Sequence, residues 1–329
     1  MNAEHVIFGS GPLGRAVAAQ LSAQGGTVRL VARHTPAPMD GVEMIAADLT
    51  DPAQAIAVAQ GAGVLYHCLS ANYGHWPQLL PPLMTGFIAA AQAAGARAVY
   101  GDNLYSYGPV TGPVQEGLAS VLSGRNVRVR TELAGRLLTA AGSEGLAVAI
   151  GRASDFYGPE VLQSSLGDRV FPALLGSRPV QFLGDPDLPH TFTFIQDFAR
   201  ALIVLGTREE ALGKIWHVPS APTITPREMV IQAAELAGVE PRFSVAPGLM
   251  IRALGLVSPT MRSVAEVLYQ VERPWVVDHS RFESAFGARV TPHREALIST
   301  LDWYRARAGV PVAAQSRSHQ QPTERGVRP

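Results

Sequence analysis

The sequence predicts an α/β fold with a doubly wound parallel sheet. A glycine-rich loop separates an apolar run from an alanine-rich helical pattern near the start of the chain, and strand and helix patterns then alternate through the first half. With 329 residues, 47% of them hydrophobic and 16% charged, the chain is long enough to bury a sizeable core. Such alternation is typical of parallel strands joined by helices that cover both faces of one sheet.

The glycine-rich loop has the spacing of a loop that cradles a dinucleotide. Gly9 would permit a tight turn, Gly11 would let the backbone approach a pyrophosphate, and Gly14 would let the helix pack closely on the strand. Pro12 and Leu13 stand at the amino end of that helix, where free N–H groups and the helix dipole favour phosphate. The loop therefore predicts a Rossmann fold that binds a dinucleotide. The alternative is a tight strand-to-helix turn without a ligand.

Six strands of the sheet are predicted from apolar and β-branched runs. They are expected at residues 5–8, 28–32, 42–46, 64–68, 97–100 and 147–151. Helices are expected among them at about residues 52–60, 77–94 and 129–141.

The second half of the chain is less regular. Short strands are expected at 179–183, 191–195 and 215–218, and Asp197 is expected to cap a helix over 198–205. The last helix is expected at about 293–307.

These patterns predict a division into regions. Residues 1–157 form the dinucleotide-binding domain, to which segments near 191–218 return. Residues 158–190 and 219–310 form a smaller C-terminal α+β substrate-binding region. Polar residues and proline dominate 311–329, which is expected to be a disordered tail.

The end of the second predicted strand bears on the choice of cofactor. An acidic residue there would bind the ribose 2′-hydroxyl of NAD, but this chain has Arg33, whose guanidinium suits a 2′-phosphate. NADP is therefore expected, with NAD less favoured, and Asp48 and Leu49 are expected to meet the adenine. The alternatives are a solvent-facing arginine at a strand end and an exposed turn aspartate.

The charge balance and the cysteine content limit which partners and which cellular compartment are expected. Formal net charge is zero, so neither a nucleic acid nor an anionic membrane is expected as a partner. Cys68 is the only cysteine, which excludes an internal disulfide and fits a reducing compartment. No signal-peptide pattern and no bilayer-spanning apolar run are present, so a cytoplasmic location is expected. No residue is assigned as a metal ligand.

Three further segments resemble the extended short-chain dehydrogenase/reductase superfamily, a group of NAD(P)-dependent epimerases, dehydratases and reductases. They are residues 98–108 after the fifth strand, 152–159 after the sixth, and 194–199 in a later strand-to-helix segment. With the glycine loop and the pair Asp48-Leu49 they follow the family's order over residues 5–308. The resemblance implies a Rossmann domain whose smaller C-terminal region closes over the nicotinamide.

The chain departs from that family's usual catalytic set. The set pairs a tyrosine with a lysine four residues later, so that the ammonium lowers the pKa of the phenol. Lys214 is the only lysine, and no tyrosine lies four residues before it. Arg128 and Arg130, in the expected helix, also lack such a tyrosine, and Asn103 stands at the place of the family's catalytic serine. The standard set is therefore absent.

Polar aromatic residues remain in the loops at the carboxyl ends of the strands, where this fold has its active site. Tyr105 is the expected proton donor and Tyr107 the second candidate, with Asn103 orienting or polarising a carbonyl. The alternative for each tyrosine is a half-buried ring whose hydroxyl binds backbone. The residues assigned to a small-molecule substrate are Tyr73, Trp76, Asp155, Tyr157 and His190.

Three functions compete. The favoured one is an NADP-dependent reductase, dehydratase or epimerase acting on a small, largely uncharged carbonyl or hydroxyl compound, with a homodimer as a possible assembly. The second is an NADP-binding sensor or regulator without turnover. The third, a nucleotide-sugar epimerase or dehydratase, is disfavoured because His190 stands where such members carry an arginine that clamps the diphosphate.

Overall fold

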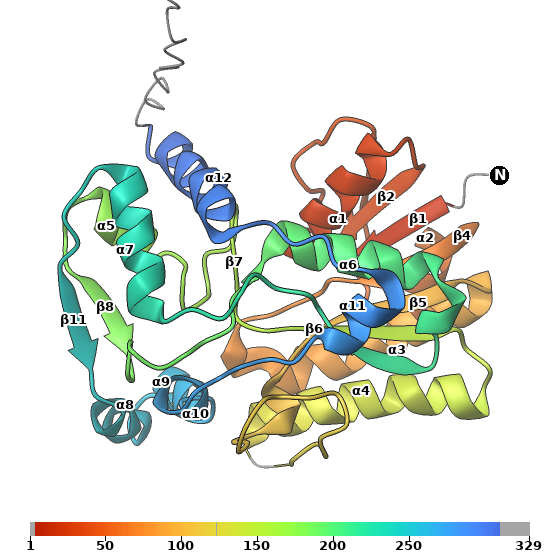
Figure 1. Ribbon diagram of the computed structural model, residues 1–329. Helices are drawn as coiled ribbons and strands as arrows, with labels where there is room; N and C mark the ends of the chain where they lie inside the picture. Colours follow the sequence, from red (N-terminus) through yellow and green to blue (C-terminus); the bar gives the residue numbers. More distant parts are fainter. Residues whose placement is uncertain (1–3, 123, 310–329) are drawn as a thin grey trace, which may run out of the picture.

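A seven-stranded parallel sheet forms the centre of the computed structural model, which describes residues 4–122 and 124–309 (Figure 1). The strand order is β10-β6-β5-β4-β1-β2-β3. In chain order the strands are β1 Glu4–Phe8, β2 Val28–Ala32, β3 Val42–Ala46, β4 Ala62–His67, β5 Arg97–Asn103, β6 Val148–Ala153 and β10 Lys214–His217. The order reverses between β1 and β4, so the switch point of the sheet, where ligands bind in such folds, lies beside the glycine loop.

Helices cover both faces of this sheet (Figure 1). One face carries α1 Pro12–Ala23, α6 Ile195–Thr207 and α11 Ser280–Phe286; the other carries α2 Pro52–Val58, α3 Trp76–Ala94 and α4 Arg125–Ser143. Because side chains alternate along each strand, each strand contributes residues to the hydrophobic cores on both faces of the sheet. In β1, Ile7 packs with α1 and α6, whereas Val6 and Phe8 pack with α2, α3 and α4.

The remaining elements lie together beside the sheet (Figure 1). Two small parallel pairings join β8 Val180–Leu183 to β11 Phe243–Ala246 and β7 Phe156–Tyr157 to β9 Thr193–Phe194. The helices here are α5 Phe171–Leu175, α7 Pro226–Ala237, α8 Gly248–Gly255, α9 Pro259–Ala265, α10 Tyr269–Glu272 and α12 His293–Arg307. The short 3-10 helices are η1 Tyr73–His75, η2 Tyr105–Tyr107 and η3 Glu209–Ala211.

The structure confirms the predicted fold class and changes two local features. β10 pairs with β6 and extends the sheet from six strands to seven. Asp197 is not a helix cap, because α6 begins at Ile195 and the aspartate lies inside its first turn. Its carboxylate accepts hydrogen bonds from the backbone N and Oγ1 of Thr291, at 2.8 and 2.7 Å. A partner so distant in sequence is invisible to a local capping pattern.

Two sequence-based expectations concern the ends and the surface of the molecule. The tail predicted at 311–329 lies outside the described residues. Within the described parts of the chain, no helix combines the length and the apolar character needed to cross a membrane.

Candidate functional site

The glycine loop turns sharply between β1 and α1. Gly9 has φ +111°, and a Cβ placed there would lie 2.7 Å from the carbonyl oxygen of Cys68. A Cβ at Gly14 would lie 1.8 Å from the carbonyl oxygen of Gly9. At Gly11 the backbone is ordinary, with φ −73°, and a Cβ would meet no atom of the described residues within 4 Å. Packing within the chain therefore requires glycine at positions 9 and 14, but not at position 11.

The open space at Gly11 fits a phosphate-containing cofactor. Gly11 is the N-cap of α1 and Pro12 is its first residue, so no side chain caps the helix. The N–H groups of the first turn and the positive end of the helix dipole are therefore free to receive an anion. Gly11, Leu13 and Gly14 are the residues that would hold the pyrophosphate of a dinucleotide.

At the carboxyl ends of β2 and β3, an exposed arginine lies near an exposed aspartate. The hydrogen bonds of Thr50 to the Asp48 carboxylate, at 2.7 and 3.0 Å, lower the pKa of Asp48, and the charge of Arg33 lowers it further. Arg33 is thus within electrostatic reach of this carboxylate and open to solvent. Leu49 differs from both, because its side chain is 3% exposed and packs in the core.

Three aromatic rings from two strand-end loops stack over the neighbouring strands. Tyr73 stacks on Trp76 with ring centroids 4.6 Å apart, and Tyr105 stacks with both at 6.2 and 6.1 Å. The guanidinium carbon of Arg130, from α4, lies 4.3 Å from the Trp76 ring centroid. The structure therefore brings together three of the predicted site residues and adds a cation to them.

The hydroxyl groups of Tyr73 and Tyr105 form a hydrogen bond of 2.5 Å. Burial raises the pKa of Tyr105 well above its ordinary value, and the neighbouring Tyr73 raises it further. The amide oxygen of Asn103 accepts from the backbone N of Tyr105 at 3.1 Å, and the Tyr269 hydroxyl donates to its carbonyl at 3.2 Å. Asn103 thus orients the turn that carries Tyr105.

Arg130 also belongs to a buried ion-pair cluster next to this stack. Arg130 donates to the hydroxyl of Tyr100 at 2.8 Å and lies 3.6 Å from the carboxylate of Asp102. Arg152 donates to the other carboxylate oxygen at 3.0 Å. The side chains of Asp102 and Arg152 are at most 1% exposed, so their charges interact with little screening.

Tyr107 is held away from the stack by a histidine. Its hydroxyl lies 2.9 Å from Nε2 of His217, and Nδ1 of that histidine lies 2.9 Å from the carbonyl oxygen of Asp278. Burial lowers the pKa of His217 to about 4, so the ring is neutral at neutral pH. Only Nδ1 can then donate to the carbonyl, and Nε2 accepts the proton of Tyr107. The hydroxyl of Tyr107 is therefore already engaged as a donor.

Asp155 connects the loop after β6 to the stacked tyrosines. Its carboxylate lies 3.3 Å from Nε2 of His190 and accepts from Ser165 at 3.0 Å. Burial alone would raise the pKa of Asp155, but these two partners outweigh it, and the pKa is lowered. The charge of Asp155 raises the pKa of both Tyr73 and Tyr105. The loops converge, because Gln163, eight residues after Asp155, donates to the side chain of Asn72, next to Tyr73, at 3.2 Å.

Tyr157 stands apart from the other predicted substrate residues. It is 1% exposed, its ring packs against Phe192 and Phe194, and its hydroxyl lies 3.5 Å from Nδ1 of His293. The structure therefore joins Tyr73, Trp76, Tyr105, Asp155 and His190, and it turns Tyr107 and Tyr157 toward other partners.

Sequence reasoning missed the charged residues beneath the site, although two signals pointed to them. Asp102 and Arg152 carry opposite charges at the ends of adjacent apolar strands, where they occupy the same register position. Arg130 lies on the buried stripe of α4, four residues after Asn126 and three before Leu133. A charge on an apolar helix face indicates a buried partner.

No family model matches the sequence, and no curated protein matches it. Solved structures do match. The epimerase Mth375 from Methanothermobacter thermautotrophicus aligns with a TM-score of 0.77 and 17% identity over 94% of each chain. The UDP-N-acetylglucosamine 4-epimerase from Bacillus cereus aligns at 0.74 and 14%, over 92% of this chain and 96% of the other. The dTDP-glucose 4,6-dehydratase from Bacillus anthracis, in complex with NAD, aligns at 0.76 and 12%, over 93% and 98%.

This chain has their fold. The likeness spans nearly the whole length of each of these proteins, so the predicted Rossmann fold is confirmed. It covers the glycine loop, the central sheet and the C-terminal region alike.

Proposed function

We propose that this protein is an NAD(P)-dependent oxidoreductase, epimerase or dehydratase that acts on a small, largely uncharged carbonyl or hydroxyl compound. The observation that carries the proposal is the open cradle at Gly11, which internal packing does not explain. The same carboxyl edge of the sheet carries the hydroxyl pair of Tyr73 and Tyr105. A cofactor cradle alone would not need this second feature.

Tyr105 is the proposed proton donor and acceptor. A bound nicotinamide dinucleotide would supply the hydride donor or acceptor. The chain would supply the coupled proton from the Tyr105 hydroxyl, and Tyr73 would accept from or donate to that oxygen as the proton moves. The negative charge of Asp155, which raises the pKa of both phenols, would disfavour a long-lived phenolate and keep Tyr105 in its protonated form between turnovers.

Arg130 is proposed to replace the absent lysine. It comes from α4, is buried, and lies over the ring of Trp76, which stacks with both phenols. Its charge lowers the pKa of Tyr73, the hydrogen-bonding partner of Tyr105. The cation and the tyrosine would thus act together from two elements rather than from one helix.

NADP is the proposed cofactor because Arg33 is exposed at the end of β2. Calorimetry with NADPH and NADH tests this. NADPH should bind more tightly, and Arg33→Ala should weaken NADPH binding by about 10- to 100-fold, the range for a charge-assisted hydrogen bond, while leaving NADH unchanged. Arg208→Ala, another exposed arginine, is the matched control. Equal affinity for both dinucleotides in the wild type would reject the NADP assignment.

A nucleotide sugar is not the proposed substrate, although MoeE5, a protein of this fold, has been solved in complex with UDP-glucuronic acid and with UDP-glucose. His190 is 3% exposed, lies against Phe192, and is paired with Asp155, so it is not free to hold a diphosphate. Calorimetry with UDP-glucose should show no tight binding. Micromolar affinity would replace this proposal with the nucleotide-sugar one.

Turnover is tested by exchange of a deuterium label from C4 of NADPH into a panel of aldehydes and ketones. Tyr105→Phe should lower the exchange rate by about 10²- to 10⁴-fold, the contribution of a positioned proton donor. Tyr304→Phe is the control, since that hydroxyl bonds the carbonyl of Val161 and its ring stacks on Phe171, not on Tyr73, Trp76 or Tyr105. An unchanged rate in Tyr105→Phe would remove Tyr105 from its role.

The raised pKa of Tyr105 and the lack of a lysine on α4 also favour a second candidate, a sensor that binds NADP without turnover. Binding of NADPH with no exchange across the whole panel would select it. Absence of binding to either dinucleotide would exclude both functions.

A further inference from the structure

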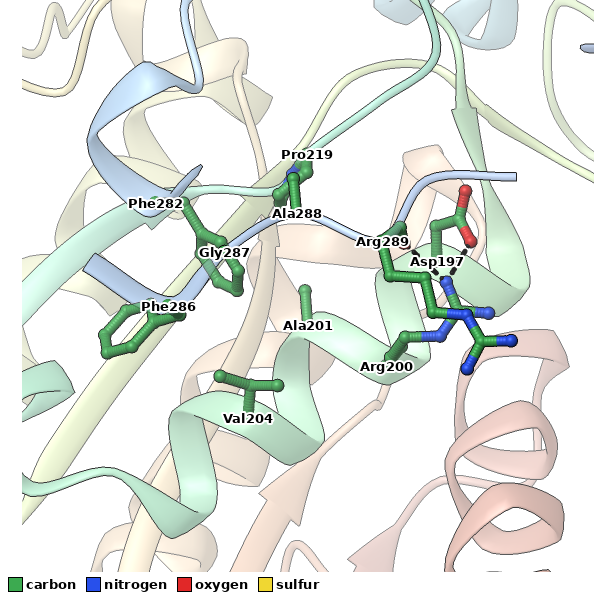
Figure 2. A pocket seen from close by; sticks show the side chains of 10 residues that line it. All are labelled: Asp197, Arg200, Ala201, Val204, Pro219, Phe282, Phe286, Gly287, Ala288 and Arg289. Atoms are coloured by element: carbon green, nitrogen blue, oxygen red, sulfur yellow. Dashed lines mark hydrogen bonds and ion pairs between the residues drawn. The ribbon is translucent and has the colours of Figure 1, made fainter. Parts of the chain in front are cut away.

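A cavity lies away from the glycine loop and the tyrosine stack. It has a volume of about 290 Å³ and sits between α6 and α11, closed at one side by Pro219 after β10 (Figure 2). None of the residues assigned to the cofactor or to the catalytic stack lines it. It is therefore a separate site in the described part of the chain.

One end of this cavity is apolar. Ala201 and Val204 from α6 face Phe282 and Phe286 from α11, with Pro219 beside them (Figure 2). The two phenylalanine rings meet edge-on with centroids 5.0 Å apart. Such walls favour an aromatic or branched aliphatic body.

The other end is cationic. Arg200 and Arg289 converge there beside Asp197 (Figure 2). The Asp197 carboxylate is 3% exposed and accepts hydrogen bonds from Thr291 and from Arg200. Arg200 also donates to the carbonyl oxygen of Arg289 at 2.8 Å. The guanidinium of Arg289 is exposed and makes no ion pair or hydrogen bond among the described residues.

The charges at this end leave an excess of one positive charge, because one carboxylate faces two guanidinium groups. That excess suits a ligand with a single negative charge. The second negative charge of a phosphate would be repelled by the Asp197 carboxylate, and no further cation would balance it. The volume lies at the small end of ligand sites.

We propose that this pocket binds a small amphipathic carboxylate, with an aryl or branched aliphatic body between α6 and α11 and its carboxylate on Arg289 and Arg200. The paired Asp197 holds Arg200 in place, and Arg289 supplies the free bidentate donor.

Calorimetry with phenylacetate and its neutral amide, phenylacetamide, tests the site on the full-length protein. Phenylacetate should bind saturably, and phenylacetamide should bind at least about 10-fold more weakly, since it loses a charge-assisted hydrogen bond. Arg289→Ala should weaken phenylacetate binding by about the same factor. The matched control is Arg294→Ala, an exposed arginine on α12 that does not line the pocket.

Two further measurements locate the ligand. Val204→Phe, which fills the apolar end, should abolish binding, and saturating NADPH should not compete with phenylacetate. No saturable binding, equal affinity for the amide, an unchanged affinity in Arg289→Ala, or competition by NADPH would each overturn the proposal. None of these outcomes depends on the catalytic function proposed above.

Discussion

The hydroxyl oxygens of Tyr73 and Tyr105 lie 2.5 Å apart, and both side chains belong to loops that leave adjacent strands of the sheet. Each phenol is therefore the hydrogen-bonding partner of the other. This pairing gives Tyr105 a defined hydroxyl direction, which a lone buried phenol would not have.

Removal of Tyr73 should lower the pKa of Tyr105. Once Tyr73 is itself ionised, its hydrogen bond and its charge both raise that pKa. Over the pH range in which both phenols titrate, Tyr73→Phe should therefore let Tyr105 ionise at lower pH, although burial keeps its pKa above the ordinary value. NMR of protein labelled at tyrosine Cζ, with the signal assigned by Tyr105→Phe, would show the shift. A midpoint that does not move would mean that the two phenols are not coupled.

Substitutions in the glycine loop should separate cofactor binding from folding. Gly11→Ala meets open space and an ordinary backbone, so thermal unfolding should be unchanged while NADPH affinity falls by about 10-fold or more, through loss of direct phosphate contact. Gly14→Ala would force a Cβ against the carbonyl oxygen of Gly9 and should destabilise the protein by about 1–3 kcal/mol. The reverse pattern would contradict the assignment of Gly11 to the cofactor.

Asp102→Asn should be strongly destabilising. The carboxylate lies between Arg130 and Arg152, and its loss would leave buried guanidinium charge uncompensated at a cost of about 3–5 kcal/mol in the free energy of unfolding. Denaturant unfolding would measure this. Glu209→Gln, whose carboxylate is 85% exposed in its pair with Arg97, is the control and should cause no measurable change.

Two buried histidines should make stability depend on pH. Burial lowers the pKa of His67 to about 3 and that of His217 to about 4, from 6.5 in both cases. Between those values and 6.5 the unfolded chain binds more protons than the folded one. The contribution of the two neutral histidines to the free energy of unfolding is therefore fully present above pH 6.5. As the pH falls below 6.5, the free energy of unfolding decreases by up to about 2.7 kcal/mol per pH unit for two groups.

Replacement of one histidine should reduce that slope. His67 packs edge-on against Phe87 and Tyr100, so a phenylalanine ring suits the position, and His67→Phe should remove about half of the dependence below pH 6. His34→Gln, at an exposed position, should leave the slope as it is. Urea unfolding at several pH values would compare the three proteins, and parallel slopes in all of them would refute the assignment.

The sequence by itself determined the sheet and the glycine loop, because both depend on local patterns. Alternating apolar runs place residues such as Val6 and Ile7 on opposite faces of a strand, and Gly9 and Gly14 are demanded by contacts within a single strand-turn-helix unit. The candidate tyrosines also followed from the rule that sites lie at the carboxyl ends of parallel strands.

Only the tertiary structure decided which of those tyrosines pairs with a second phenol and which buried cation lies beside the stack. Tyr107 is bound by His217 across more than a hundred residues. Tyr105, two residues away, meets Tyr73 and the Trp76 ring on which Arg130 lies. Hydrogen bonds and ion pairs of this kind depend on three-dimensional proximity, which no local periodicity encodes. The same reason moved Asp197 from a helix cap to the partner of Thr291.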